Sequence, residues 1–285
     1  MPLRATFSII DNIIKMRQLK LLVAAMVFGL LLSSCTGSSP KNDPNHIKVG
    51  ITSGPEREIA ETARKVAKEK YNLDVELVTF NDYVMPNEAL NNGDIDANAF
   101  QHVPYLDEQS RQRGYKLAVV GNTFLYPIVA YSKKIKNVSE LQKGSTVVIP
   151  NDPTNGGRSL LLLESAGLIT LKENVGLSPK VTDIVANPKQ LRILEIEAPQ
   201  LPRVLDDKEV VVAVINNNFA AQAGLKAEEY GILTENRDSP YVNVIVARED
   251  NKGVGKVKNF VKAYQSDEVL QTAKEIFHDG AIKGW

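Results

Sequence analysis

The sequence predicts an α/β fold with mainly parallel sheets, and three observations support that prediction. Short runs rich in β-branched residues recur along the chain from His46 onward. Longer segments with helical periodicity separate them, as expected where a helix returns the chain between parallel strands. The length of 285 residues also suits two lobes of roughly 100 to 150 residues each.

The expected strands lie at residues 47–52, 74–80, 94–100, 117–121, 126–132, 145–150, 192–198, 210–216 and 241–247. Two other segments have a clear helical period. Apolar residues recur at spacings of three and four from Ile59 to Ala67, and again from Val269 to Phe277. Each predicted helix therefore has one apolar face that can cover a sheet.

Residues 1–34 have the composition of a lipoprotein signal peptide. The cationic stretch MRQLK precedes an apolar run from Leu21 to Leu32, which is too short to span a membrane comfortably. The next residues, LSSC, resemble a bacterial lipobox that ends at Cys35, the only cysteine. A buried thiol is the alternative, but the position of Cys35 favours lipidation. The usual signal would begin at Met16, which leaves residues 1–15 as an extension.

The composition after the signal peptide predicts an exported, lipid-anchored protein. Residues 35–45 comprise the lipidated cysteine and a stretch rich in residues that do not pack, so we expect a flexible tether. Over the whole chain, basic and acidic residues balance at 34 each. Because no basic surplus is available for a phosphate backbone, nucleic acid is not an expected partner. We expect the folded part to face the periplasm or the exterior.

Motifs for catalysis, nucleotides and metals are missing. The Gly156-Gly157 pair lacks the lysine and the Ser/Thr spacing of a phosphate-binding loop. No GxSxG elbow is present, and the single cysteine is assigned to lipid. The histidines, at 46, 102 and 278, are too far apart for a metal-binding pair. We therefore expect no enzyme activity, no cofactor and no metal.

Polar and aromatic side chains lie at or just beyond several predicted strand ends, where open parallel sheets bind ligands. These candidates are Tyr83, Phe100, His102, Tyr105, Arg158 and Asn216. The turn NDPTNGG leads into a predicted helix with Arg158 in its first turn, where backbone amides and a guanidinium can bind a carboxylate. A surface arginine is the alternative for Arg158. Aromatic residues at strand ends pack into cores more often than they line pockets, so residue types alone favour core packing.

Several segments together resemble the methionine-binding lipoproteins of the methionine ABC importer, in the NlpA lipoprotein family. They include HIKVGITSG, LDVELVTFNDYVMPNEALNNGDIDANAFQHVPYLD, VVIPNDPTNGGRSLLLL and SPYVNVIVAREDNK. The resemblance extends from His46 to the carboxyl terminus. It implies a type II periplasmic-binding-protein fold, in which two crossing segments join two α/β lobes around a ligand cleft. The implied first lobe comprises residues 46–127 and 243–285, and the second comprises residues 128–242.

The resemblance also implies a site and partners. An aromatic cage of Tyr83, Phe100, His102 and Tyr105 would surround the thioether, since sulfur makes favourable contacts with aromatic rings. Arg158 would bind the ligand carboxylate, and Asn216 and Asn243 would bind its polar end. The expected ligand is L-methionine, with D-methionine as a further candidate, and the expected partners are the permease and ATPase subunits of the importer. A methionine-containing dipeptide, another amino acid, or a role as a surface interaction protein or adhesin are the alternatives.

Overall fold

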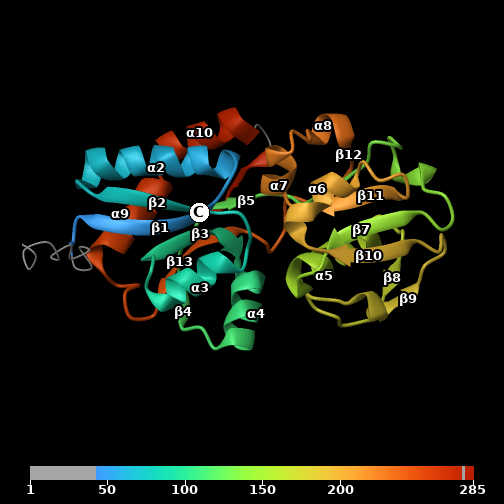
Figure 1. Ribbon diagram of the computed structural model, residues 1–285, viewed down its shortest axis with the longest axis horizontal. Coiled ribbons are helices and arrows are strands. Elements are labelled where there is room, and N and C mark those ends of the chain that lie inside the picture. Colours follow the sequence, from blue (N-terminus) through green and yellow to red (C-terminus); the bar gives the residue numbers. More distant parts are fainter. Residues whose placement is uncertain (1–42, 278–279) are drawn as a thin grey trace, which may run out of the picture. The chain divides into compact units, whose positions relative to one another are not determined.

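The computed structural model describes residues 43–277 and 280–285. The predicted signal peptide, the lipidation site Cys35 and most of the predicted tether lie outside these residues. Residues 44–285 form one compact unit that contains two five-stranded sheets with flanking helices (Figure 1). Within the described part of the chain, no helix is both long enough and apolar enough to cross a bilayer.

The first sheet has the strand order β2-β1-β3-β13-β4. Its strands are β1 (His46–Thr52), β2 (Asp74–Phe80), β3 (Ala97–His102), β4 (Leu117–Asn122) and β13 (Asn243–Arg248). β1 pairs in parallel with β2 and β3, whereas β13 is antiparallel to both of its neighbours. One reversed strand therefore lies within an otherwise parallel sheet.

The second sheet repeats this arrangement in the order β10-β7-β11-β6-β12. Its strands are β6 (Val129–Tyr131), β7 (Thr146–Pro150), β10 (Arg192–Ile196), β11 (Val210–Ile215) and β12 (Gly231–Thr234). β6 is antiparallel to β11 and β12, and the other pairs are parallel. The antiparallel strands are β13 in the first sheet and β6 in the second. Each is the first strand that the chain adds to its sheet after crossing over from the other sheet. The predicted mainly parallel α/β architecture is confirmed.

Helices cover both faces of the first sheet (Figure 1). Its helices are α2 (Pro55–Tyr71), α3 (Met85–Asn92), α4 (Val103–Arg113), α9 (Gly255–Tyr264) and α10 (Asp267–Phe277). The second sheet is accompanied by α5 (Pro153–Ser165), α6 (Leu201–Val204), α7 (Asn217–Gln222) and α8 (Ala227–Tyr230). α2 packs against α9 and α10, so the two helices with the clearest periodicity in the sequence lie together on one face.

Short elements complete the chain. These are β5 (Phe124–Leu125), β8 (Thr170–Leu171), β9 (Ile184–Ala186), β14 (Ile282–Lys283) and 3₁₀ turns at Val138–Glu140, Val181–Asp183 and Ala198–Gln200. β14 pairs with β5, which fastens the carboxyl terminus to the first half of the molecule.

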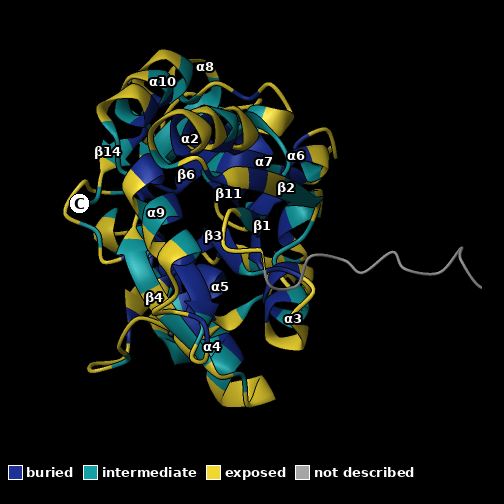
Figure 2. Ribbon diagram, turned by 90° about the vertical axis from the view of Figure 1, so that its left-hand side faces the viewer, coloured by how far each residue is buried: buried dark blue, intermediate teal, exposed yellow. Residues whose placement is uncertain are grey.

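Each sheet has its own apolar core. In Figure 2, where the two sheets overlap, dark blue marks the buried residues along strands such as β1, β3 and β11. In the first, Ile51 of β1 packs with Ile59 of α2, and both are almost fully buried. In the second, Ile149 of β7 packs with Leu160 and Leu163 of α5. Separate cores are the property expected of two lobes.

Two strand predictions were wrong in detail. The predicted strand 126–132 is divided, because β5 ends at Leu125 and β6 begins at Val129, and residues 126–128 connect the two sheets. The predicted strand 94–100 begins later, at Ala97, since Gly93 ends α3 in a left-handed conformation and a turn follows it. We propose that the lobes have the boundaries expected from the sequence, 46–127 with 243–285 and 128–242.

Candidate functional site

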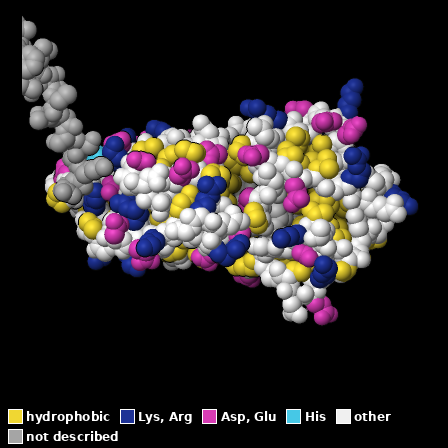
Figure 3. Space-filling model, turned by 60° about the horizontal axis from the view of Figure 1, so that its bottom comes forward, with side chains coloured by type: hydrophobic (Ala, Val, Ile, Leu, Met, Phe, Trp, Pro, Cys, Tyr) yellow, Lys and Arg dark blue, Asp and Glu magenta, His cyan; other side chains and the backbone are white. Residues whose placement is uncertain are grey.

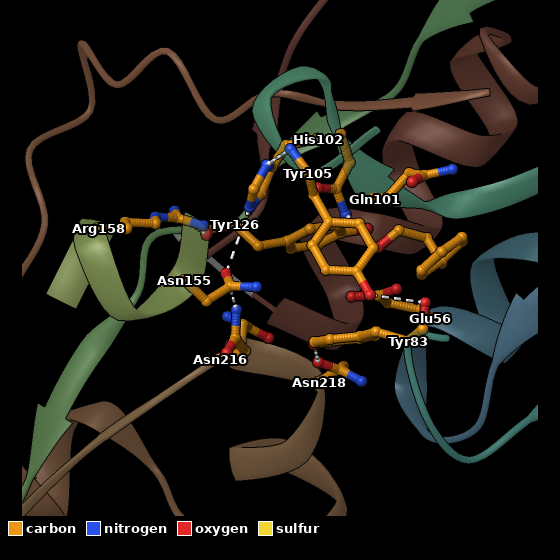
Figure 4. A pocket seen from close by; sticks show the side chains of 13 residues that line it. Glu56, Tyr83, Gln101, His102, Tyr105, Tyr126, Asn155, Arg158, Asn216 and Asn218 are labelled. Carbon is orange, nitrogen blue, oxygen red and sulfur yellow. Dashed lines mark hydrogen bonds between the residues drawn. The ribbon is translucent and has the colours of Figure 1, made fainter. Parts of the chain in front are cut away.

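A narrow cavity of about 30 Å³ lies between residues of the two sheets (Figure 4). All seven candidate residues line it, namely Tyr83, Phe100, His102, Tyr105, Arg158, Asn216 and Asn243. Six further residues line the cavity and were not predicted from the sequence, namely Glu56, Gln101, Tyr126, Asn155, Asn217 and Asn218.

Three aromatic rings form one wall of the cavity. The centroids of Tyr83 and Phe100 are 5.9 Å apart, and Tyr105 meets Phe100 edge-on at 6.2 Å. The Tyr105 hydroxyl donates a hydrogen bond to the backbone oxygen of Tyr83 at 2.9 Å, which ties the Tyr105 ring to the segment that carries Tyr83. β3 ends at His102 and α4 begins at Val103 with Pro104 in its first turn, so Tyr105 lies in a helix.

His102 lies at the junction of β3 and α4 and is 4% exposed. Burial, together with the nearby positive charge of Arg158, lowers the pKa of His102 to about 3, so the imidazole is neutral at physiological pH. Its Nδ1 accepts a hydrogen bond from the backbone N–H of Tyr105 at 3.2 Å. The proton of the neutral ring is therefore on Nε2, which donates to Asn155 Oδ1 at 3.3 Å.

A chain of hydrogen bonds fixes the direction of the amides in the second half of the site. Asn155 Nδ2 donates to the carboxylate of Asp152, so Asn155 Oδ1 is the acceptor for His102 and for Asn216 Nδ2 at 2.8 Å. Asn216 must then direct its Oδ1 elsewhere, and this atom is buried without a hydrogen-bond partner among the described residues. The network thus leaves Asn216 with a free acceptor at the cavity.

Other lining residues also carry unused polar atoms. Tyr126 Oη, Asn217 Oδ1 and Asn218 Nδ2 are buried and have no partner within the described ranges. Buried polar groups in proteins are almost always hydrogen-bonded, and these atoms meet at one cavity. Such a mixture of donors and acceptors suits a small ligand that carries both kinds of group.

Arg158 is 4% exposed and does not lie in the first turn of its helix, which corrects the sequence prediction. α5 begins at Pro153, within the predicted loop, and Arg158 lies in its second turn. Asp152 caps this helix by accepting a hydrogen bond from the backbone N–H of Asn155 at 2.9 Å. The backbone amides expected to bind an external anion are therefore partly satisfied by the chain itself.

Glu235 is the partner of Arg158 that the sequence did not reveal. Arg158 Nε donates to Glu235 Oε1 at 2.8 Å, and Nη2 donates to Glu235 Oε2 and to the backbone oxygen of Tyr126. The guanidinium also lies 4.5 Å from the centre of the Tyr241 ring. Nη1 has no hydrogen-bond partner in the part of the chain that the structure describes, so it can bind a further acceptor at the cavity.

Glu56, in the first turn of α2, contributes a buried carboxyl group to the cavity and is 7% exposed. Its Oε2 accepts a hydrogen bond from the Thr52 hydroxyl at 3.0 Å. Burial raises the pKa of Glu56 to about 7, and the hydrogen bond from Thr52 only partly opposes that rise. Near neutral pH, both the protonated and the ionised form of the Glu56 carboxyl are therefore populated.

The remaining amides support the aromatic wall from behind. Asn87 and Gln101 exchange two hydrogen bonds, at 2.7 and 2.6 Å, and Asn98 donates to Asn87 Oδ1 at 2.9 Å. All three are almost fully buried. This network links α3 to β3 and so helps to position the segment that carries Tyr83.

Among the described residues, no group of three or more His, Cys, Asp or Glu side chains could hold a metal ion.

A cavity between two such sheets is typical of periplasmic substrate-binding proteins, and solved structures of that class match the chain. A crystal structure of the methionine binding protein MetQ superposes with a TM-score of 0.84 at 65% identity, covering 85% of this chain and 99% of that chain. A nutrient binding protein from Burkholderia cenocepacia bound to methionine gives 0.81 at 48% identity, covering 84% of this chain and 100% of the other. The predicted type II periplasmic-binding-protein fold is confirmed.

The NlpA lipoprotein family matches residues 47–285, and this chain belongs to that family. The D-methionine-binding lipoprotein MetQ of Escherichia coli (strain K12) is 62% identical over 263 residues, which covers 92% of this chain and 96% of the relative. Lipoprotein 28 of Escherichia coli O157:H7 is 53% identical over 262 residues, covering 92% and 96%. The family resemblance seen in the sequence is confirmed.

Proposed function

We propose that this protein captures methionine outside the cytoplasmic membrane and delivers it to the permease of an ABC importer. The relatives named for methionine binding, and the methionine-bound structural relative, support this ligand. Family membership supports attachment of the chain to a membrane through lipid on Cys35. The protein binds its ligand and performs no chemistry on it. Its partners are the permease and ATPase subunits.

The observation that carries the proposal is the pairing of an aromatic wall with unsatisfied polar atoms in one cavity. Tyr83, Phe100 and Tyr105 offer ring faces and edges to a thioether. Asn216 Oδ1 and Asn217 Oδ1 are acceptors suited to the ammonium group. Nη1 of Arg158 is a donor suited to the carboxylate, with Asn243 nearby in the lining of the cavity.

The neutral state of His102 fits the same proposal. A charged imidazole beside the thioether would favour water in the cavity, whereas a neutral ring leaves that region apolar.

The surface is consistent with a soluble binding domain rather than a nucleic-acid binder. On the face shown in Figure 3, basic and acidic side chains are interspersed, in keeping with their equal numbers in the sequence.

Isothermal titration calorimetry tests the proposal. L-methionine and D-methionine are titrated into the purified protein, with norleucine as a matched control that replaces sulfur by a methylene group. We expect micromolar or tighter binding of methionine and weaker binding of norleucine, because the sulfur–aromatic contacts are lost. Glycyl-methionine tests the dipeptide alternative. Binding of the dipeptide or of another amino acid, with no response to methionine, would contradict the proposed ligand.

A further inference from the structure

α7 connects the cavity to the opposite sheet. Asn217 and Asn218, in its first turn, line the cavity together with the preceding Asn216. Its last residue, Gln222, does not line the cavity and lies next to the segment that follows β1. One short helix of the second sheet therefore meets the ligand site at one end and the first half of the molecule at the other.

Gln222 and Ser53 form a reciprocal pair of hydrogen bonds. Gln222 Nε2 donates to the backbone oxygen of Ser53 at 2.8 Å, and the Ser53 hydroxyl donates to Gln222 Oε1 at 3.0 Å. The residues are 169 positions apart in the sequence. Both polar atoms of the Gln222 amide are thus used in bonds to the opposite half of the molecule.

Gly54 makes the close approach possible. It has a φ of 97°, a conformation that residues with a side chain rarely adopt. A Cβ atom on Gly54 would lie 2.5 Å from Gln222 Cγ, so a side chain there would force the two segments apart. The same position caps the start of α2, whose next residues include Glu56 of the cavity.

A second link crosses at the edge of the cavity. The hydroxyl of Tyr83, which follows β2, donates a hydrogen bond to Asn218 Oδ1 of α7. Its ring also packs on Phe219 of α7, with centroids 4.9 Å apart. Tyr83 and Asn218 line the cavity, so any variant of this pair would also alter the binding site. The contact between Gln222 and Ser53 also joins the two halves of the molecule, but neither residue lines the cavity.

We infer that the Gln222–Ser53 contact is a latch that stabilises the closed arrangement of the two lobes, both in the ligand-free protein and over a bound ligand. Separation of the lobes must break both hydrogen bonds, because they join segments on opposite sides of the cavity. The inference rests on the proposed function for its ligand. Since Gln222 does not line the cavity, it is a positioning residue that acts through closure and not through ligand contact. Gln222 therefore affects the dissociation rate of methionine more than its association rate.

Dissociation kinetics of the full chain test the latch. Bound labelled methionine is chased with excess unlabelled methionine, and Gln222→Ala is compared with wild type. We expect dissociation to be about tenfold faster, as the loss of two modest hydrogen bonds predicts, and association to change less than about twofold. Ser53→Ala removes the hydroxyl donor but keeps the carbonyl acceptor, so its effect should be smaller. In the double variant with Gln222→Ala, Ser53→Ala should add little to the dissociation rate.

Gln271→Ala is the matched control. Gln271 Nε2 donates to Glu275 Oε1 at 2.9 Å within α10, so this substitution removes a surface amide hydrogen bond without breaking a contact between the lobes. We expect wild-type kinetics from it. Equal dissociation rates for Gln222→Ala and wild type would overturn the latch.

Hydrogen–deuterium exchange separates failure of the latch from failure of the proposed ligand. In the protein without ligand, Gln222→Ala should increase exchange in residues 53–57 and 216–222, and leave the second-sheet strand 146–150 unchanged. This measurement does not depend on methionine. Unchanged exchange in both segments would overturn the latch even if methionine binds. Increased exchange with no methionine binding would support the latch and reject the ligand.

Discussion

Arg158 and Glu235 form a partly buried ion pair that ties α5 to both segments connecting the two sheets. Arg158 donates to the carboxylate of Glu235 and to the backbone oxygen of Tyr126. Glu235 in turn exchanges hydrogen bonds with the backbone of Ile128, through its N–H at 3.0 Å and its Oε2 at 3.3 Å. The residue proposed to bind the ligand carboxylate therefore also holds the connection between the lobes.

This double role predicts different effects for the two partners. Arg158→Ala should weaken methionine binding at least tenfold, or about 1.4 kcal/mol, because it removes the donor for the carboxylate. It should also destabilise the fold by about 1 to 3 kcal/mol, since the partly buried carboxylate of Glu235 loses its charged hydrogen-bond partner. Calorimetry measures the first effect, and urea denaturation of the ligand-free protein measures the second.

Glu235→Gln is the control for this pair. It keeps a hydrogen-bond acceptor for Arg158 and leaves the guanidinium available to the ligand, so methionine affinity should fall less than in Arg158→Ala. A loss of affinity equal to that of Arg158→Ala would mean that the arginine acts only through the connecting segments.

The aromatic wall predicts a graded loss of affinity. Phe100→Leu keeps an apolar side chain but removes the ring that meets both Tyr83 and Tyr105, so we expect methionine affinity to fall about tenfold. The affinity for norleucine, which has no sulfur, should fall less. Tyr105→Phe keeps the ring and loses only the hydrogen bond to Tyr83, so its effect should be smaller than that of Phe100→Leu. Equal losses for methionine and norleucine in Phe100→Leu would argue against a sulfur–aromatic contact.

Glu56 predicts a pH dependence of stability. Its pKa in the folded protein is about 7, above the usual value of 4.5, so the folded state binds a proton more tightly than the unfolded state. The contribution of Glu56 is therefore most favourable at acidic pH and is lost as the pH rises from about 4.5 to 7. The loss should be on the order of 3 kcal/mol relative to Glu56→Gln, which does not titrate.

Denaturation of wild type and Glu56→Gln at several pH values measures this difference. Comparing the two proteins cancels the opposite effect of His102, whose lowered pKa reduces stability as the pH falls below 6.5. A stability difference that stays constant between pH 4.5 and 7.5 would show that the Glu56 carboxyl is not protonated in the folded state.

Local patterns were sufficient to predict much of the fold and several of the residues that line the cavity. Apolar periodicity located α2 and α10, and the position of residues after strands located Tyr83 and Arg158, because the edge of a parallel sheet is where ligands bind. Each of these inferences uses residues that are close together in the sequence.

The parts that the sequence did not predict depend on distant contacts. Glu235 lies 77 positions after Arg158, and no local pattern marks it as a buried partner. The pairing of Gln222 with Ser53 likewise exists only when both sheets are in place. Glu56 resembles an ordinary acidic residue in the first turn of a helix, where acidic residues are common, so its burial in the cavity leaves no signal in the sequence.

Mass spectrometry of the natively purified protein tests the central claim most directly. The protein is denatured after purification without added amino acids, and the released small molecules are identified and quantified. The account predicts methionine in near-stoichiometric amount from wild type, and much less from Arg158→Ala prepared in the same way. Release of a sugar, a peptide without methionine, or a different amino acid from the wild-type protein would contradict it.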